Sequence, residues 1–332
     1  MAGVSISTVS LVINRKGPVT KETELKVLQA IEKLNYHPQR SARGLVTKQT
    51  HNFGFILSSD HFSHAEPFYT KIFLGTEFQA RSHDYYILLT TIDRDVSAKN
   101  MPRFLLERNV DGVILAGAVP RQIIDYIHKN NFPFVLVDYY FSDRNDSVVL
   151  IDNTLGIKLI IDHLIELGHH EIAFIGGDMG HPSMQKRCDT FKSYLQQKGI
   201  VADKLKIECT EERSGTESGF AATNRLLDKK LPISAIVAAN DAMAVGALRA
   251  CRDRKLRIPE DIAITGFDNV ESSITARPTL TTVHVPKEEM GAAAVRHLVD
   301  VLQGHQSKGV KIIMPVRLIA RESTLGTRFK AD

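Results

Sequence analysis

The sequence has 332 residues, a length that predicts two or three domains. Hydrophobic residues make up 43% of it and charged residues 24%, an ordinary composition that excludes a largely disordered chain. Its longest apolar runs, such as 132–137 and 234–239, have strand length and fall far short of the ~20 residues that a membrane span needs. The N-terminus also has no basic segment followed by an apolar run, so we expect a cytoplasmic protein without a signal peptide.

Positive charge is concentrated at the N-terminus. Residues 1–50 contain eight Lys and Arg against three Glu, a net charge of +5, whereas the rest of the chain sums to −1. A basic head on a nearly neutral body predicts that the head contacts a polyanion such as nucleic acid.

The first fifty residues have the apolar spacing of three short helices. Ser5 can cap a helix that runs to Ile13. We expect Ile6, Val9 and Ile13 to share one face, with the outward positions being Ser7, Thr8, Ser10 and Leu11. Thr20 can cap a second helix, whose predicted buried stripe consists of Leu25, Leu28, Ile31 and Leu34.

The third helical segment, residues 39–47, carries basic residues and a leucine. Helices below ~12 residues are marginal in water, so this one is predicted to fold only when docked. Its composition suits a linker that becomes ordered on a polyanion and inserts a side chain into the minor groove.

From residue 51 onward, short apolar runs alternate with longer amphipathic stretches. The predicted strands are 52–58, 85–91, 111–117, 132–138, 148–152, 172–177, 234–240, 261–268 and 312–319. The predicted helices are 73–82, 123–130, 155–167, 184–198, 218–227, 242–253 and 288–302. This alternation predicts an α/β fold of two doubly wound parallel sheets, with a small-molecule site between them beyond the carboxyl ends of the strands.

Motifs for catalysis, nucleotides and metals are missing from the sequence. No dinucleotide fingerprint, P-loop or nucleophile elbow occurs, and the histidines lack metal-ligand spacing. The three cysteines, Cys188, Cys209 and Cys251, are widely spaced and are predicted to be reduced thiols at core or neutral positions. We therefore expect a binding protein without a cofactor, rather than an enzyme.

An ordered set of short motifs resembles the LacI/GalR family of bacterial transcription repressors. The motifs are residues 2–10 (AGVSISTVS), 12–14 (VIN), 34–38 (LNYHP), 42–45 (ARGL), 163–169 (HLIELGH), 240–241 (ND), 266–269 (GFDN) and 280–283 (LTTV). The resemblance implies a helix-turn-helix that reads operator DNA, a hinge helix that enters the minor groove, and a periplasmic-binding-protein-like core. It implies the divisions 1–38 for a partial helix-turn-helix head, 39–50 for the hinge and linker, 51–160 plus 283–316 for one core subdomain, and 161–282 plus 317–332 for the other.

By this resemblance, residues 5–14 form the recognition helix, and Ile6 and Ser7 near its start meet base edges in the major groove. The full set of predicted DNA-contacting residues is Ser5, Ile6, Ser7, Thr8, Ser10, Asn14, Arg43 and Leu45, with Leu45 as the wedge in the minor groove. Two features depart from the family: the sequence starts where the turn begins, leaving the first helix without a counterpart, and Leu11 stands where arginine is common. A start codon placed too far downstream, a shortened sequence, or a sensor that binds operator poorly would each account for the first departure.

The resemblance also implies an effector site with candidate residues Phe68, Tyr69, Arg187, Asn240 and Asp268. Arg187 stands in the pattern Arg-x-x-x-Phe, and its guanidinium can donate paired hydrogen bonds to vicinal hydroxyls or a carboxylate. Structural roles compete with these assignments, since Arg187 can be a surface arginine and the two aromatics can belong to the core. Asp241 and Asp152 can be helix N-caps, and Asn269 can be a turn residue.

The combined prediction is a ligand-responsive, DNA-binding transcriptional regulator, in particular a repressor of carbohydrate-related genes. We expect a homodimer, because a palindromic operator needs two heads at a fixed spacing, and a sugar or sugar derivative as effector. Two alternatives remain: an exported solute-binding protein and an effector sensor that does not bind DNA.

Overall fold

The computed structural model describes residues 2–14, 17–34, 49–59, 67–93, 101–201, 206–209, 214–305 and 309–326. The chain divides into two compact units, residues 1–50 and residues 51–332, each of which we treat by itself. No helix in these ranges is both long and apolar enough to cross a lipid bilayer.

The N-terminal unit contains helices α1 (Ile6–Asn14) and α2 (Lys21–Lys33). Both predicted caps are confirmed: the Thr8 amide donates to Ser5 Oγ over 3.1 Å, and the Thr23 amide donates to Thr20 Oγ1 over 3.4 Å. Glu22 and Glu24 lie in the first turn of α2, where they complement the positive end of the helix dipole.

The core of this unit differs from the predicted one. Val12 and Val27 are the buried apolar residues of the two helices, whereas Ile6 is 91% exposed and does not share a buried face with Val9 and Ile13. The predicted stripe on α2 is also wrong, because it is largely exposed: Leu25, Leu28 and Leu34. Two helices in contact shield only the strip of each that faces the other, and Val12 and Val27 occupy those strips in the described part.

The first sheet of the second unit is six-stranded and parallel over the residues that are described. Its order is β11-β5-β4-β3-β1-β2. The strands are β1 (Asn52–Ser58), β2 (Tyr86–Ile92), β3 (Gly112–Ala116), β4 (Phe134–Val137), β5 (Val148–Ile151) and β11 (Lys311–Met314).

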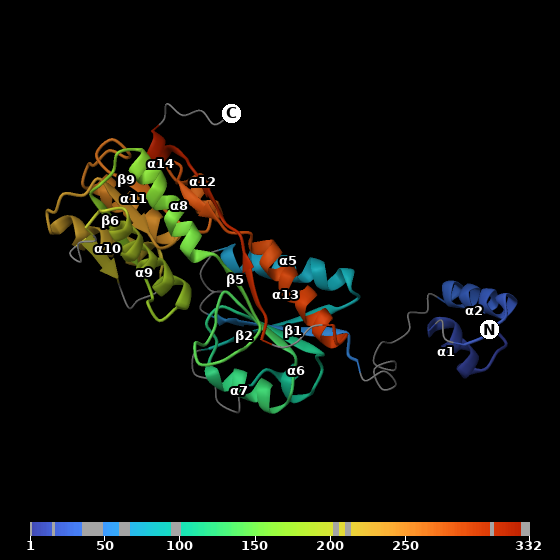
Figure 1. Cartoon of the computed structure of the whole chain (residues 1–332). Helices are drawn as coiled ribbons and strands as arrows, with labels where there is room; N and C mark the ends of the chain where they lie inside the picture. Colours follow the sequence, from blue (N-terminus) through green and yellow to red (C-terminus); the bar gives the residue numbers. More distant parts are fainter. Residues whose placement is uncertain are drawn as a thin grey trace. The chain divides into compact units, whose positions relative to one another are not determined.

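Helices cover both faces of this sheet, with α5 (Pro67–Ser82) and α13 (Lys287–Leu302) over one face and α6 (Arg103–Leu106) and α7 (Arg121–Lys129) over the other (Figure 1). Because neighbouring strand residues point to opposite faces, Phe55 joins the core under the first pair of helices and Ile56 the core under the second. The α5 and α13 backbones approach closely at glycine: a Cβ on Gly75 would lie 1.9 Å from the Glu288 carbonyl oxygen.

The second sheet has the order β7-β6-β8-β9 and is also parallel. Its strands are β6 (Ile172–Gly176), β7 (Ile207–Cys209), β8 (Ala235–Ala238) and β9 (Ala263–Thr265). Two pairs of helices pack within this region: α8 (Asn153–Glu166) on α9 (Pro182–Gln197), and α10 (Thr216–Asp228) on α11 (Asp241–Asp253). The parallel sheets and the helical head confirm the predicted fold class.

The predicted strand 312–319 is wrong as a single element. It is divided into β11, which belongs to the first sheet, and β12 (Arg317–Ile319), which pairs antiparallel with β10 (Thr282–His284). Pro315 lies between them, and a proline has no amide hydrogen to continue a sheet ladder. The sequence prediction also omitted β7, β10 and three short helices: α6, α12 (Glu271–Thr275) and α14 (Glu322–Leu325).

Candidate functional site

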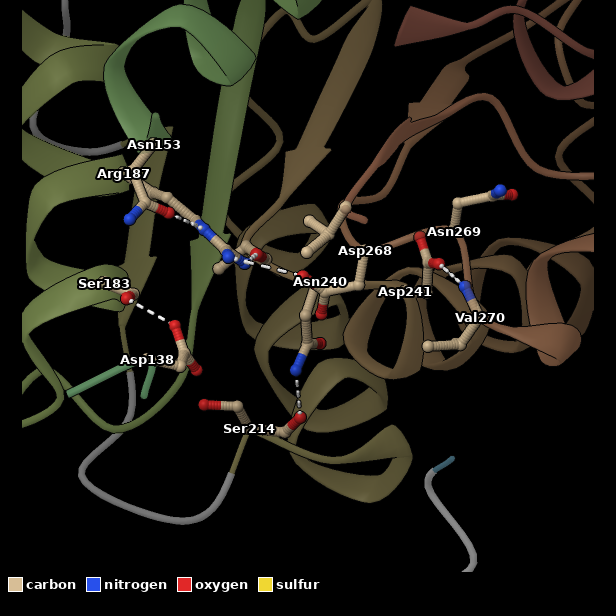
Figure 2. Close-up of polar contacts among 12 residues, drawn as sticks. Asp138, Asn153, Ser183, Arg187, Ser214, Asn240, Asp241, Asp268, Asn269 and Val270 are labelled. Carbon is tan, nitrogen blue, oxygen red and sulfur yellow. Dashed lines mark hydrogen bonds and ion pairs between the residues drawn. The ribbon is translucent and has the colours of Figure 1, made fainter. Parts of the chain in front are cut away.

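A cluster of buried polar side chains lies where elements of the two sheets meet (Figure 2). Asp138 directly follows β4 of the first sheet, and Asp268 follows β9 of the second. Arg187 and Ser183 come from α9 and complete the cluster. Carboxyl ends of parallel strands are the usual positions for ligand-contacting residues in α/β sheets.

Arg187 is 2% exposed and makes three hydrogen bonds. Its Nε donates to Asn153 Oδ1 over 2.7 Å, one terminal nitrogen donates to the Ala239 carbonyl over 2.6 Å, and the other donates to Asp268 Oδ1 over 3.3 Å. The guanidinium carbon also lies 3.7 Å from the centre of the Phe267 ring. A guanidinium has five N–H donors, so these contacts hold the group in place and leave donors for a ligand.

Asp138 joins α5 to α9. Its Oδ2 accepts a hydrogen bond from the Tyr69 hydroxyl, and its Oδ1 accepts one from the Ser183 hydroxyl, each over 3.0 Å. Burial, followed by the Asp138 charge, raises the pKa of Tyr69 well above its ordinary value, so this hydroxyl keeps its proton and remains a donor.

His181 is a partly buried residue at the N-terminus of α9, and its Nε2 atom is fully buried. Its Nδ1 accepts a hydrogen bond from the Ser183 amide over 3.3 Å, and burial lowers the pKa of the ring. The neutral ring must then carry its proton on Nε2, which lies 3.9 Å from Asp138 Oδ2 and has no hydrogen-bond partner among the described residues. A buried N–H donor of this kind can be satisfied by a ligand oxygen.

One further carboxyl group, Asp241, and one lysine, Lys287, lie near Asp268. Burial raises the pKa of Asp268 to about 6, against the opposing effect of Arg187 and Lys287. Burial and the charge of Asp268 raise the pKa of Asp241 to about 8. Lys287, at the start of α13, is 4% exposed and donates to the Asp268 carbonyl over 2.6 Å. Positively charged groups and carboxylates thus alternate in the site, and neither positive nor negative charge dominates it.

The structure brings together three of the five predicted effector residues: Tyr69, Arg187 and Asp268. Phe68 is buried and its ring makes an edge contact with Tyr69, which fits its competing role in the core. Asn240 lies beside the cluster, but both ends of its amide are engaged: its oxygen accepts from the Met243 amide and its nitrogen donates to the Ser214 carbonyl.

Of the two aspartates predicted as helix N-caps, Asp152 and Asp241, only the first is confirmed. Asp152 does cap α8, because its carboxylate accepts from the Leu155 amide over 2.8 Å. The cap of α11 is Asn240 rather than Asp241, so that prediction is wrong. Asp241 instead accepts from the Val270 amide and the Thr282 hydroxyl. Asn269 is more than a turn residue, since its side chain accepts from Arg321 over 2.7 Å.

Five residues of the cluster were absent from the sequence prediction: Asp138, Asn153, His181, Ser183 and Lys287. Asp138 carries a signal that the sequence does show, since it is the polar end of an apolar strand, as Asp268 is. The other four occupy helix starts, where polar residues are common and no ligand role can be distinguished.

On the N-terminal unit, the predicted DNA-contacting residues lie on α1 or just before it. Ser5, Ile6, Ser7 and Ser10 are exposed, and Thr8 is half-buried. Ser5 Oγ lies 2.7 Å from Ser7 Oγ and 2.8 Å from Thr8 Oγ1, so these hydroxyls form one polar group at the start of the helix. Leu11 is 40% exposed, as predicted. Arg43, Leu45 and the side chain of Asn14 lie outside the described residues.

Comparisons with known proteins match both units. Residues 1–39 match the family described as bacterial regulatory proteins, lacI family, and residues 161–324 match the periplasmic binding protein-like domain. The ribose operon repressor of Escherichia coli (strain K12) is 32% identical over 303 residues, which cover 90% of this chain and 90% of that protein.

Solved structures agree with these sequence matches. The lac repressor dimer bound to operator and the anti-inducer ONPF superimposes with a TM-score of 0.83 at 29% identity, covering 97% of this chain and 96% of that one. The complex of the transcriptional regulator CelR with cellobiose has a TM-score of 0.75 at 30% identity, covering 97% of each chain.

Proposed function

Because the chain belongs to the lacI family of bacterial regulatory proteins, it is a ligand-responsive transcriptional regulator, and we propose that it represses carbohydrate-related genes. A small effector bound between two subdomains changes the affinity of the head for operator DNA. This regulator acts by binding rather than by catalysis, and it acts in the cytoplasm, where its operator is.

The cluster around Asp138 and Arg187 is the observation that carries the proposal. Donors and acceptors alternate there: the guanidinium donates, the imidazole has an N–H available to donate, and the carboxylates of Asp138 and Asp268 accept. A hydroxyl both donates and accepts, so a molecule with several hydroxyls matches such a set without bringing an unpaired charge into a buried site. Phe68 and Tyr69 add rings beside this polar group. A sugar or sugar derivative is the chemistry that fits.

The subdomains proposed for the core are residues 51–160 with 283–316 and residues 161–282 with 317–332. Three contacts of the cluster join residues of the first to residues of the second: Asp138 accepts from Ser183, Asn153 accepts from Arg187, and Lys287 donates to the Asp268 carbonyl. A ligand that engages these same groups changes the relative energy of two subdomain arrangements, which is what a population shift requires. The hinge, proposed as residues 39–50, passes this change to the head.

The DNA-binding role is assigned to the exposed start of α1. Ser5, Ile6, Ser7, Thr8 and Ser10 present hydroxyls and one apolar side chain, which suit base edges and thymine methyl groups. We assign phosphate or base contact to Asn14 and Arg43, and minor-groove insertion to Leu45.

A homodimer is proposed because two heads must face two half-sites. Exposed apolar side chains on one side of the core support this assembly, since α5 exposes Leu74 and Phe78, and the edge strand β2, which α5 contacts, exposes Leu89. Exposed apolar patches mark interaction surfaces. Sedimentation at micromolar concentration should give a dimer, and a monomer would refute this part of the proposal.

The effector proposal is tested by measuring the thermal stability of the purified chain against pentoses, hexoses, disaccharides and, as the contrasting class, purines. We expect one sugar to raise Tm. His181→Ala should then lower the affinity of the chain for that sugar by about tenfold, because the ligand loses one buried hydrogen bond of roughly 1.5 kcal/mol. The matched control is His170→Ala, which removes an exposed histidine and should bind normally. A purine as the sole ligand, or unchanged sugar binding by His181→Ala, would refute the assignment.

A further inference from the structure

Lys287, the first residue of α13, is a buried cation whose contacts lead to the backbone of the candidate site. Its Nζ donates to the carbonyls of Asp268, Val285 and Asn269 over 2.6, 3.2 and 3.4 Å. The same nitrogen lies 5.9 Å from the centre of the Phe68 ring. Burying an ammonium is unfavourable unless hydrogen bonds compensate for the lost water, so three carbonyls directed at one nitrogen indicate a specific arrangement.

The turn that supplies two of these carbonyls has a strained backbone. Asp268 has a φ of +108° and Asn269 a φ of +51°. Asparagine tolerates the left-handed region, but a φ of +108° is uncommon for any residue with a Cβ and persists only where its surroundings hold it. The Asp268 amide donates to the Val283 carbonyl over 2.9 Å, and the Asp268 carboxylate accepts from Arg187. The Lys287 ammonium completes these contacts, because it holds the carbonyl side of the turn.

We propose that Lys287 is a positioning residue for the effector: its ammonium holds the turn at 268–269 in the conformation that presents the Asp268 carboxylate to the ligand. This role rests on the effector site proposed above and adds to it a residue of α13. Lys287 acts through Asp268, because its hydrogen bonds to the described residues go to backbone carbonyls.

The ammonium also affects the charge of Asp268. Burial raises the pKa of this carboxyl group to about 6, and the charges of Arg187 and Lys287 oppose that increase. The groups that face the carboxyl are Arg187, Lys287, Asp138, Asp241 and Tyr69. A protonated Asp268 is a weaker acceptor for a ligand hydroxyl, so sugar affinity should fall as pH drops through this pKa. Removing the Lys287 charge should move that fall to higher pH.

The test compares Lys287→Met with the wild-type chain by calorimetric titration of the sugar found by thermal shift, between about pH 5 and pH 8. At the upper pH we expect about tenfold weaker binding by Lys287→Met, because the turn has lost the donor that holds it. The midpoint of the acid fall should also lie at higher pH than in the wild type. A purely structural loss would weaken binding equally at every pH and leave the midpoint in place.

Lys71→Met is the matched control. It removes a lysine of α5 that pairs with Glu288, the residue after Lys287, and whose side chain is 47% exposed. The net charge of the chain changes by the same amount, but the turn keeps its ammonium. Both the sugar affinity and the midpoint should therefore stay as in the wild type.

Lys287→Gln separates the two effects of the ammonium, because a glutamine amide still donates to a carbonyl but carries no charge. It should show the shift of the midpoint to higher pH, and it replaces Lys287→Met if that variant does not fold. An unchanged midpoint in the Lys287 variants, or wild-type sugar binding by Lys287→Met at every pH, would overturn the positioning role and leave the effector site standing. A wild-type chain that binds no sugar would overturn the effector site itself, and the role of Lys287 with it.

Discussion

Replacing Arg187 with lysine tests how the buried cluster is held together. Lysine keeps the positive charge near Asp268 but presents a single ammonium in place of a planar group that donates in several directions. In the wild-type chain those directions lead to Asn153, to the Ala239 carbonyl and to Asp268. An ammonium cannot reproduce all three hydrogen bonds, so Arg187→Lys should leave buried acceptors unsatisfied.

The size of the effect follows from those contacts. A hydrogen bond that involves a charged group contributes about 1.5–3 kcal/mol to stability. Two of the three are expected to be lost, and lysine recovers part of the charge interaction. Arg187→Lys should therefore lower the free energy of unfolding by about 3 kcal/mol.

Arg249 provides a matched control for this substitution. It also pairs with a carboxylate, Glu217, over 2.8 Å, and its guanidinium lies 4.5 Å from the centre of the Phe220 ring. Its side chain is 52% exposed, however, so solvent screens the ion pair and replaces its hydrogen bonds. Arg249→Lys should cost less than about 1 kcal/mol.

Urea unfolding followed by circular dichroism measures both variants against the wild-type chain. The expected order of stability is wild type, then Arg249→Lys slightly below, then Arg187→Lys well below. If Arg187→Lys unfolds within 1 kcal/mol of the wild type, or if the two variants lose equal stability, the structural role assigned to the buried guanidinium is wrong.

Two further predictions concern buried titration and helix packing. The pKa of Asp241 is raised to about 8 in the folded chain, whereas an aspartate in the unfolded chain has a pKa near 3.9. Between these two pH values the folded state binds one more proton than the unfolded state. The free energy of unfolding should therefore fall as pH rises through this window. Asp241→Asn should weaken that dependence when urea midpoints at pH 5 and pH 8 are compared, and an unchanged slope would exclude Asp241 as its source. Gly75→Ala places a methyl group against the Glu288 carbonyl and should cost about 2–3 kcal/mol in unfolding free energy. Gly215→Ala, where the added carbon meets nothing within 4 Å, should cost less than about 1 kcal/mol, and equal losses would argue against a tight contact between α5 and α13.

Much of the fold was predictable because parallel strands buried on both faces leave a strong pattern. The apolar runs at 112–116 and 172–176 are buried throughout, and both were predicted as strands. Strands of three residues carry no such pattern: β7 (Ile-Glu-Cys) and β10 (Thr-Val-His) owe their pairing to neighbours distant in sequence. The buried face of the helical head was predicted wrongly for a related reason: the apolar spacing on α2 does not reveal which side of that helix packs against α1.

The candidate site was predictable only in part. Arg187, Asp268 and Tyr69 were found through their positions in motifs or at element ends. The contact between Asp138 and Ser183 spans 45 residues and two sheets, and nothing local in either segment indicates it. His181 is a similar case, because its role depends on burial and on an unpartnered Nε2.

The central claim, that an effector bound in the core controls binding of the head to DNA, is tested most directly by one titration. A DNA duplex is first selected from a random pool by its binding to the chain, and it is then labelled. The chain is titrated into this duplex at several salt concentrations, with and without the sugar found by thermal shift. Tight binding is expected, with log K falling against log salt by roughly 0.9 for each phosphate contact, and the sugar should change the affinity by tenfold or more. Two results would contradict this claim in a chain that binds the sugar. One is the absence of any duplex preference at concentrations of order 10⁻⁵ M, where non-specific binding is ordinarily seen. The other is a DNA affinity that does not change when the sugar is added.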